Sequence, residues 1–275
     1  GEPLLSSLNS SKNRFEILKF RLYKEEELSQ FRHERSVREF YHLMNETHYQ
    51  TNAQDIRRLW DAPDQLFLTA HKKERLIGGI WGIYEGGQKE SLSLEVFRGL
   101  RRPKGNLVPQ MLASQSYYPE AMILRSLRIS RISVIKEGRR LGIGRHLVEQ
   151  LIEGIKDQNL QSGKSEESKI DYLSVSFGLT SELLEFWRAC KMEWIHIGSH
   201  QDKTTGLHAA VVVFPFTEAG RKWVKEARAK FKGDADILKS ADYLRESSRK
   251  ELAKISHKTG FDERDRGVLE AFREY

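Results

Sequence analysis

The segment RISRISVIKEGRRLGIGR, residues 128–145, decides how the rest of the chain is interpreted. Its first half alternates β-branched and polar residues from Ile129 to Val134, a pattern that predicts a strand. A turn is expected at Lys136–Gly138, before the glycine-containing run RRLGIGR. Apolar residues then recur at the spacing of one helical face: Leu147, Val148, Leu151, Ile152 and Ile155. The sequence therefore predicts a strand, a glycine loop and a helix, in that order.

The glycine loop has the composition of a pyrophosphate-binding site. Gly142 and Gly144 leave the backbone bare where the helix begins, so that unpaired N–H groups and the positive end of the helix dipole point to one place. The expected contacts are Arg139, Arg140, Leu141, Gly142, Ile143, Gly144 and Arg145. The spacing RxxGxG differs from the phosphate loops of nucleotide hydrolases and dinucleotide-binding proteins. A surface turn rich in arginine is the alternative interpretation, but the flanking strand and helix favour the phosphate site.

Length and composition limit the class of protein. The 275 residues can bury a full core, and one large domain with an appendage is expected. The single cysteine, Cys190, excludes an internal disulfide framework and a cysteine-rich metal site, and no metal ligands are predicted. No apolar run approaches the roughly 20 residues that cross a bilayer, and the first residues lack the pattern of a signal peptide. We therefore expect a cytoplasmic protein without a membrane partner.

The positive charge of the chain is concentrated in one segment. The whole chain has a net charge of +7, and the segment from Arg98 to Arg145 holds eleven Lys or Arg residues against two acids. Such a concentration is typical of a surface that binds a polyanion, such as coenzyme phosphates or an RNA backbone. A solvated basic face without a specific partner is the alternative, which the neighbouring glycine loop disfavours.

The remaining pattern predicts an α/β protein in three parts. Residues 1–35 are expected to form a flexible or irregular lead, residues 36–217 the main domain with a basic helical insertion at 88–126, and residues 218–275 a helical tail. Further strands are predicted at 65–70, 76–84, 171–177, 192–199 and 207–214. Further helices are predicted from Ser36, from Thr51 to Pro63, at about 90–100, at about 107–118 and after Thr180.

This order of elements resembles the GNAT acetyltransferase fold, a mixed central sheet with helices on both sides, here with a small helical C-terminal appendage. Several segments are similar to one branch of that superfamily, the bacterial tRNA(Met) cytidine acetyltransferases. They are RRPKGNLVPQ (101–110), LRISRISV (127–134), RRLGIGR (139–145), DYLSVSFGLTSELLEFW (171–187) and GSHQDKTTG (198–206). The RxxGxG loop is shared across the superfamily, whereas RRPKGN and LSVSFG are much more specific.

The resemblance implies an N-acetyltransferase that uses acetyl-CoA. The backbone of Ile132, Ser133 and Val134 would run beside the pantetheine arm and the acetyl group. The N–H of Val134 would donate to the oxyanion that forms during acetyl transfer. The loop from Arg139 to Arg145 would hold the pyrophosphate.

Three further residues are candidates for the coenzyme site and for the chemistry. Glu182 matches a family position near the coenzyme, and Arg188 lies next to Ala189, where relatives tend to carry arginine. Glu182 and His200 are the candidates for the general base. The alternatives are an acid placed favourably at a helix N-terminus for Glu182 and a surface residue on a loop between two strands for His200.

The implied acetyl acceptor is the exocyclic N4 amine of a cytidine in RNA, with the wobble cytidine of elongator tRNA(Met) as the expected target. Expected RNA contacts are Arg101, Arg102, Lys104, Lys222, Lys225 and Arg228. One alternative is a GNAT enzyme that acetylates a protein or a small amine. Another is a weakly active module that binds acetyl-CoA and RNA and needs an ATPase partner.

Two departures from the family favour the dependent module. The chain has Ile135-Lys136 where relatives usually carry His-Pro, and it lacks the family's helicase-like ATPase module with its GxxxxGK[ST] loop. The chain is therefore expected to be a fragment or a stand-alone relative. Its expected partners are tRNA and an ATPase or helicase module, in cis or in trans.

Overall fold

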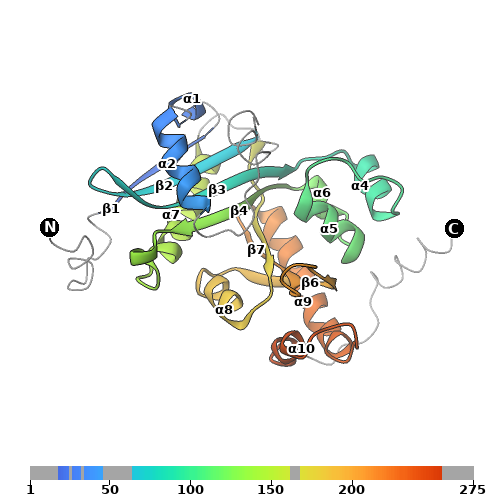
Figure 1. Cartoon of the computed structure of the whole chain (residues 1–275). Coiled ribbons are helices and arrows are strands. Elements are labelled where there is room, and N and C mark those ends of the chain that lie inside the picture. The colour runs from blue at the N-terminus through green and yellow to red at the C-terminus, as the bar shows by residue number, and fades with distance from the viewer. Residues whose placement is uncertain (1–17, 25–26, 32–33, 46–63, 162–167, 256–275) are drawn as a thin grey trace. The chain divides into compact units, whose positions relative to one another are not determined.

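The computed structural model describes residues 18–24, 27–31, 34–45, 64–161 and 168–255. The helix that the sequence predicts from Thr51 to Pro63 lies outside these residues. The chain divides into two compact units (Figure 1). Unit 1 combines Gly1–Tyr84 with Ile129–Ser162, and unit 2 combines Glu85–Arg128 with Gly163–Tyr275. Both units are therefore discontinuous in sequence.

The strands follow the order β1-β2-β3-β4-β5-β7-β6 in a seven-stranded sheet. Their bounds are β1 Leu18–Tyr23, β2 Gln65–Lys72, β3 Arg75–Gly86, β4 Arg125–Val134, β5 Tyr172–Gly178, β6 Glu193–Gln201 and β7 His208–Pro215. β2 pairs with β3, and β6 with β7, in antiparallel fashion. The strands predicted from alternation are confirmed, each within a few residues of its expected ends.

Part of the lead that the sequence predicts to be flexible or irregular over residues 1–35 is regular in the structure. Residues 18–23 form β1, whose Leu18 pairs with Lys72 and whose Tyr23 pairs with Phe67 on β2. The short helix α1 (Leu28–Phe31) follows. The sequence LKFRLY does alternate, but only over six residues, and its charged side chains belong to the kind of exposed face that an edge strand carries. So short an alternation is a weak signal on its own.

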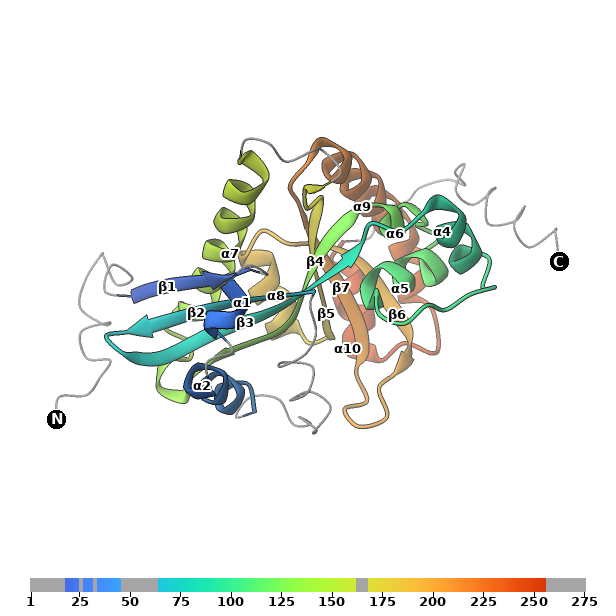
Figure 2. The same cartoon turned by 90° about the horizontal axis from the view of Figure 1, so that it is seen from above.

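In unit 1, helices cover both faces of β1–β3. The helix α2 (Glu34–Asn45) buries Val37, Phe40 and Met44 against Phe67 and Trp81 of the sheet. The helix α7 (Ile143–Leu160) lies on the opposite face, as Figure 2 shows. The burial of these side chains supplies the hydrophobic stabilisation of the unit, at roughly 25 cal/mol for each Å² of apolar surface removed from water.

Glycines in β3 allow these helices to approach the sheet closely. A Cβ on Gly79 would lie 2.6 Å from Cε2 of Phe40 in α2 and 2.9 Å from the carbonyl oxygen of Leu68. On the other face, a Cβ on Gly78 would lie 3.0 Å from Cδ1 of Leu147 in α7. The close approach that a glycine-rich strand predicts is confirmed at both positions.

Unit 2 places helices on both faces of β5, β7 and β6. On one face, α5 (Leu107–Gln115), α6 (Glu120–Ile123) and α9 (Glu218–Lys239) form a core over Tyr172, Ile195 and Val211. On the other face, α8 (Ser181–Ala189) packs Trp187 against Phe177, with the ring centroids 6.2 Å apart. Tyr172 and Phe177 differ in parity along β5, so their side chains leave the sheet on opposite faces.

The C-terminal helices α9 and α10 (Glu246–Ala253) confirm that the tail is helical as far as residue 255. The helix α9 is part of the unit 2 core, because Trp223, Val224 and Ala227 are buried there. The ring of Trp223 packs at a tilt against that of Tyr172, with the ring centroids 4.7 Å apart. The basic insertion is also helical, with α4 (Glu90–Phe97) before α5 and α6. The domain boundary at residue 217 stays a prediction.

Asp171 joins three segments of unit 2 that lie far apart in the sequence. Its Oδ2 accepts a hydrogen bond from the N–H of Arg125, and its Oδ1 accepts one from the hydroxyl of Thr217, at 2.9 and 2.5 Å. Its carbonyl oxygen accepts from the N–H of Phe216 at 2.8 Å. The hydroxyl of Thr217 in turn caps α9 by accepting from the N–H of Gly220. One residue before β5 therefore fixes the starts of both β4 and α9.

None of the helices in the described ranges is long and apolar enough to cross a membrane. In the same ranges, no group of three or more His, Cys, Asp or Glu side chains could hold a metal ion.

Candidate functional site

The end of β4 and the start of α7 form the predicted glycine loop, which belongs to unit 1. Directly after the strand, the N–H of Ile135 donates to the carbonyl oxygen of Ile77 in β3 at 2.9 Å. Because successive peptide groups in a strand point in opposite directions, the N–H and C=O of Val134 point away from β3. The last residue of β4 therefore presents its backbone polar groups on the side away from β3.

The loop folds back onto this strand end. A single 3₁₀ turn at Lys136–Gly138 reverses the chain, and Nε of Arg139 then donates to the carbonyl oxygen of Val134 at 3.3 Å. A Cβ on Gly138 would lie 2.9 Å from Cγ1 of Val134 and 3.0 Å from Cδ1 of Ile143. Glycine is therefore the residue that fits there, and it keeps the guanidinium of Arg139 beside the backbone of Val134.

The first turn of α7 carries backbone donors at the end of this loop. Gly142 is the N-cap residue at φ +83°, in the left-handed region that favours glycine, and it has no side chain to cap the helix. The first N–H groups of α7 therefore lack both intrahelical acceptors and a side-chain cap. Ile143 is fully buried and anchors this turn to the core. Such a helix start binds anions.

Three guanidinium groups surround the same turn. Arg139, Arg140 and Arg145 are exposed, and Nε of Arg145 pairs with Oε1 of Glu149 at 2.9 Å. Partial burial acts to raise the pKa of Glu149, but hydrogen bonds with His146 and Arg145 outweigh it and lower that pKa. Glu149 therefore neutralises part of the charge of Arg145, and the loop keeps a surplus of positive charge. A pyrophosphate would complement that surplus.

The strand residues next to the loop differ in what their side chains do. Ser133 is buried, and its hydroxyl donates to the carbonyl oxygen of Leu43 in α2 at 2.8 Å. Ser133 thus ties β4 to α2, and its backbone is the part left to line a ligand. Ile132 and Val134 are half-buried. The structure therefore brings the predicted residues at 132–134 and 139–145 together in one unit.

The two candidate bases, Glu182 and His200, both belong to unit 2. Glu182 is exposed in the first turn of α8, which Thr180 caps by accepting from the N–H of Leu183. The sequence placed His200 on a loop, and this is wrong: it lies within β6. There it is exposed, with Nδ1 3.0 Å from the hydroxyl of Ser199. The strand extends further than predicted because His208 at the start of β7 pairs with Gln201.

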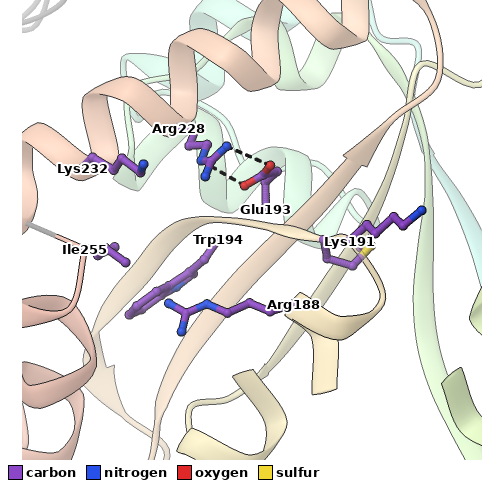
Figure 3. Close-up of a pocket in the computed structure, with 8 residues that line it drawn as sticks. Arg188, Lys191, Glu193, Trp194, Arg228, Lys232 and Ile255 are labelled. Carbon is purple, nitrogen blue, oxygen red and sulfur yellow. Dashed lines mark hydrogen bonds and ion pairs between the residues drawn. The ribbon is translucent and has the colours of Figure 1, made fainter. Parts of the chain in front are cut away.

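Arg188 and Arg228, predicted for the coenzyme and for RNA respectively, line one pocket of unit 2 (Figure 3). The guanidinium of Arg188 lies over the ring of Trp194, 5.9 Å from its centroid. Arg228 forms two contacts of 3.0 Å with the carboxylate of Glu193. The sequence could not bring these residues together, because they lie on two helices that are separated by the β6–β7 hairpin.

The other predicted RNA contacts are exposed in two places of unit 2. Arg101, Arg102 and Lys104 lie on the connection between α4 and α5, where Arg101 pairs with Glu95 at 3.4 Å. Lys222 and Lys225 lie on the solvent side of α9. All five can reach a phosphate from the surface.

Sequence reasoning missed Glu85, a buried carboxylate at the end of β3. It accepts hydrogen bonds from the N–H groups of Leu107 and Val108 at the start of α5, at 2.9 and 3.3 Å. It also pairs with Nε of Arg128 on β4 at 2.9 Å. In the sequence, the features that point to this pair are an acid, Glu85, at the end of the apolar run IWGIY and an arginine, Arg128, on the strand after the insertion. This carboxylate fixes the start of α5 within the basic insertion.

Comparisons with known proteins agree with the predicted fold. The family model for GNAT acetyltransferase 2 matches residues 39–168 and 155–217. The tRNA(Met) cytidine acetyltransferase TmcA of Actinobacillus pleuropneumoniae serotype 5b (strain L20) is 42% identical over 196 residues, which are 71% of this chain and 32% of that protein. The protein of that name from Yersinia pestis (strain D106004) is 38% identical over 198 residues, 72% of this chain and 27% of that protein.

Among solved structures, the ribosomal-protein-S18-alanine N-acetyltransferase from Escherichia coli aligns with a TM-score of 0.45 and 10% identity, over 73% of this chain and 94% of that chain. This chain thus spans about a third of the length of the curated relatives given above. The predicted GNAT fold and the resemblance to the tRNA(Met) cytidine acetyltransferases are confirmed. The chain belongs to the GNAT acetyltransferase 2 family.

Proposed function

We propose that this chain transfers the acetyl group of acetyl-CoA to the exocyclic N4 amine of a cytidine in RNA, in the cytoplasm. The observation that carries the proposal is the segment from Val134 to Arg145, where a strand end is followed by Arg139, Arg140 and an uncapped helix start that carries Arg145 in its first turn. Family membership supports the same chemistry. The relatives named above are tRNA(Met) cytidine acetyltransferases, which supports RNA as the acceptor.

In this proposal the coenzyme lies along β4 and the start of α7. The first N–H groups of α7 and the guanidinium groups of Arg139, Arg140 and Arg145 bind the pyrophosphate. The backbone at 132–134 accompanies the pantetheine arm. Arg139 is suited to this role, because its contact with the carbonyl of Val134 already holds it at the strand end.

The chemical step forms a C–N bond from the cytidine amine to the acetyl carbon and breaks the thioester C–S bond. The amine loses a proton, and the coenzyme leaves as a thiolate that is then protonated. The amine is a poor nucleophile because its lone pair is delocalised into the ring. Catalysis must therefore come from positioning, proton removal and stabilisation of the tetrahedral oxyanion. The N–H of Val134, which points away from β3, is the proposed oxyanion donor.

The proposed general base is Glu182 or His200, and each has a side chain exposed to solvent. A carboxylate or imidazole can accept the amine proton as the new bond forms. Substitution separates the two candidates. We expect the substitution of the true base, Glu182→Gln or His200→Gln, to lower kcat with little change in KM for acetyl-CoA. The same substitution at the other residue should leave kcat nearly unchanged.

The proposed acceptor is the wobble cytidine of elongator tRNA(Met). An anticodon loop offers a base that is already outside a duplex, so less unstacking energy opposes its entry into a site. Arg101, Arg102, Lys104, Lys222 and Lys225 are the proposed surface contacts to phosphates. Phosphate contacts position RNA without reading its sequence, so the choice of tRNA depends on other groups.

The test is nucleoside mass spectrometry of mixed tRNA after incubation with the protein and acetyl-CoA. The variant Gly142→Asp places a side chain and a negative charge at the helix start, and it should abolish N4-acetylcytidine. Lys156→Ala, at an exposed position on the same helix, is the matched control and should leave the product unchanged. Product formation that Gly142→Asp leaves intact would contradict the proposed coenzyme site.

Two alternative functions give different results in the same experiment. Acetylation of a peptide or a small amine, with no effect of RNA, would indicate a GNAT enzyme with another acceptor. Binding of acetyl-CoA and RNA without product would indicate a module that needs an ATPase partner. The buried Ile135, which offers no titratable group beside the loop, favours the second alternative over the first.

A further inference from the structure

A pocket of about 260 Å³ in unit 2 lies beside Trp194, at the start of the edge strand β6. Its walls come from the end of α8, from α9 and from Ile255 just after α10 (Figure 3). Four of its eight lining residues are Lys or Arg, and one is an acid. A pocket with this composition repels cations and attracts anions.

The single acid of the pocket is already engaged. Both oxygens of Glu193 contact the guanidinium of Arg228 at 3.0 Å, through Nη1 and Nε. A guanidinium has five N–H donors, so Arg228 keeps donors on its Nη2 side. Glu193 therefore holds Arg228 in one orientation but cannot also neutralise the other cations of the pocket.

The remaining cations have no acidic partner within the described part of the chain. No carboxylate there forms an ion pair with Arg188, Lys191 or Lys232. The carboxylate of Glu251 accepts instead from Ser181 and Lys254, both at 2.7 Å. Lys191 and Lys232 thus carry charges that no side chain of the described residues balances, and Arg188 adds a third charge that Glu251 offsets only in part.

Two of these charges converge on the pocket. Figure 3 shows Lys232 reaching from α9 toward Arg228, and Arg188 lying beneath the ring of Trp194 from the side of α8. The ammonium group of Lys191 points away from the others, so Lys191 lies at the rim. Trp194 is 5% exposed, so its apolar ring excludes water from one part of the pocket wall. Partial exclusion of water strengthens the attraction between these cations and an anion.

We propose that this pocket is a phosphate-binding site. A phosphate matches it in charge and in the number of oxygens that Arg188, Arg228 and Lys232 can contact. The source is either a backbone phosphodiester of RNA or a small phosphorylated molecule. The proposal rests on the proposed function only for the RNA source, since phosphate binding requires the pocket alone.

The experiment measures binding of a fluorescent oligocytidine to the full chain over a series of salt concentrations. Lys232→Ala and Arg188→Ala should each weaken binding and lower the slope of log K against log salt by about 0.7, the value for one lost contact to single-stranded nucleic acid. Lys156→Ala, in unit 1, is the control and should change neither. Thermal unfolding of each variant checks that the fold is kept.

A variant that should tighten binding, rather than weaken it, distinguishes a binding site from a cluster that only stabilises the fold. Glu193→Gln removes the only negative charge of the pocket and releases donors of Arg228, so it should tighten binding severalfold. If the residues only stabilised the fold, Glu193→Gln would lower the unfolding temperature and leave binding unchanged or weaker. That result would overturn the proposal.

Inorganic phosphate and AMP identify the source. If unlabelled oligocytidine displaces the fluorescent probe but inorganic phosphate and AMP do not, the pocket binds an RNA backbone. Direct binding of AMP or phosphate that is lost in Lys232→Ala, with normal oligonucleotide binding, assigns it to a small phosphorylated molecule. If Lys232→Ala and Arg188→Ala bind every probe like the unchanged chain, the pocket is not a phosphate site. Nucleoside mass spectrometry measures N4-acetylcytidine in a separate experiment. The absence of that product would therefore leave the binding result valid.

Discussion

Arg128 on β4 donates from Nε to Oε1 of Glu85 on β3 at 2.9 Å, and both side chains are almost completely shielded from water, at 11% and 2% exposure. The same carboxylate accepts from the first two N–H groups of α5. Such a buried pair is tolerated because each partner satisfies the other, and the loss of one leaves an uncompensated charge. The position of the basic insertion in unit 2 therefore depends on one carboxylate.

Glu85→Ala should lower the free energy of unfolding by about 3–5 kcal/mol, because it leaves the Arg128 charge buried and removes the acceptors at the start of α5. Denaturant unfolding measures the change. Glu95→Ala breaks an exposed pair with Arg101 and serves as the control, with an expected change of no more than about 1 kcal/mol. Equal losses in the free energy of unfolding would show that the buried pair stabilises the protein no more than the exposed pair does.

Gly79→Ala should destabilise the protein by about 1–3 kcal/mol through overpacking. Its Cβ would lie 2.6 Å from the ring of Phe40 and 2.9 Å from a backbone oxygen, so that α2 must shift. Gly198→Ala is the matched control, since its Cβ would meet Ala209 at an ordinary 3.6 Å. Thermal and denaturant unfolding should give a clear loss for the first and a small change for the second. A neutral Gly79→Ala would mean that α2 is not held against β3 as described.

His196 should make the protein less stable as the pH falls. Burial lowers the pKa of His196 to about 4, and its Nδ1 lies 2.5 Å from the hydroxyl of Ser116. In the unfolded chain the imidazole has its ordinary pKa near 6.5. Between these values only the unfolded state takes up the proton, so stability is complete above about 6.5 and is lost as the pH falls toward 4.

The expected contribution of His196 to this loss is about 2 kcal/mol between pH 7 and pH 5, from the difference in proton uptake. Urea unfolding at the two pH values measures it. The variant His196→Gln keeps a hydrogen-bonding group without a titration in this range, so its stability should fall less. Parallel pH profiles for the two proteins would contradict a neutral, buried His196.

Gly142→Ala should weaken acetyl-CoA binding about tenfold, the loss of roughly one hydrogen bond to a charged group. Its φ of +83° strains any side chain, and the new methyl group stands at the start of α7. Gly99→Ala has nearly the same φ, +76°, with open space around its Cβ, and it controls for backbone strain. Isothermal titration of both variants with acetyl-CoA should show a loss for Gly142→Ala alone. Equal losses would trace the effect to strain.

Local patterns predicted the parts of the structure that depend on neighbours in sequence. The strand, loop and helix around Gly142 follow from alternation, glycine and helical spacing within about 30 residues, and the helix predicted after Thr180 is α8, which Thr180 caps. The hairpin of β6 and β7 was also predictable, because its strands are adjacent in the chain. These features required no knowledge of distant contacts.

The features that prediction missed depend on residues far apart in the chain. Glu85 and Arg128 are 43 positions apart, and Arg188 and Arg228 are 40 positions apart. Each of these residues carries a charge that would ordinarily be solvated, so only the folded chain identifies a partner or a shared pocket. In the sequence, α9 is a tail of alternating basic and acidic residues. Its Trp223, which is buried in the structure, is the sequence feature that indicates contact with a core.

The Asp171 junction has a consequence for folding during synthesis. The segment 85–128 belongs to unit 2, but Asp171, which fixes the start of β4, and Thr217, which caps α9, emerge 43 and 89 residues after Arg128. At about 5–20 residues per second, the apolar face of α5 with Val108 and Leu112 stays uncovered for roughly 5–20 seconds on the ribosome. A nascent chain of this protein therefore exposes a hydrophobic surface that a chaperone can bind before the ribosome reaches α9.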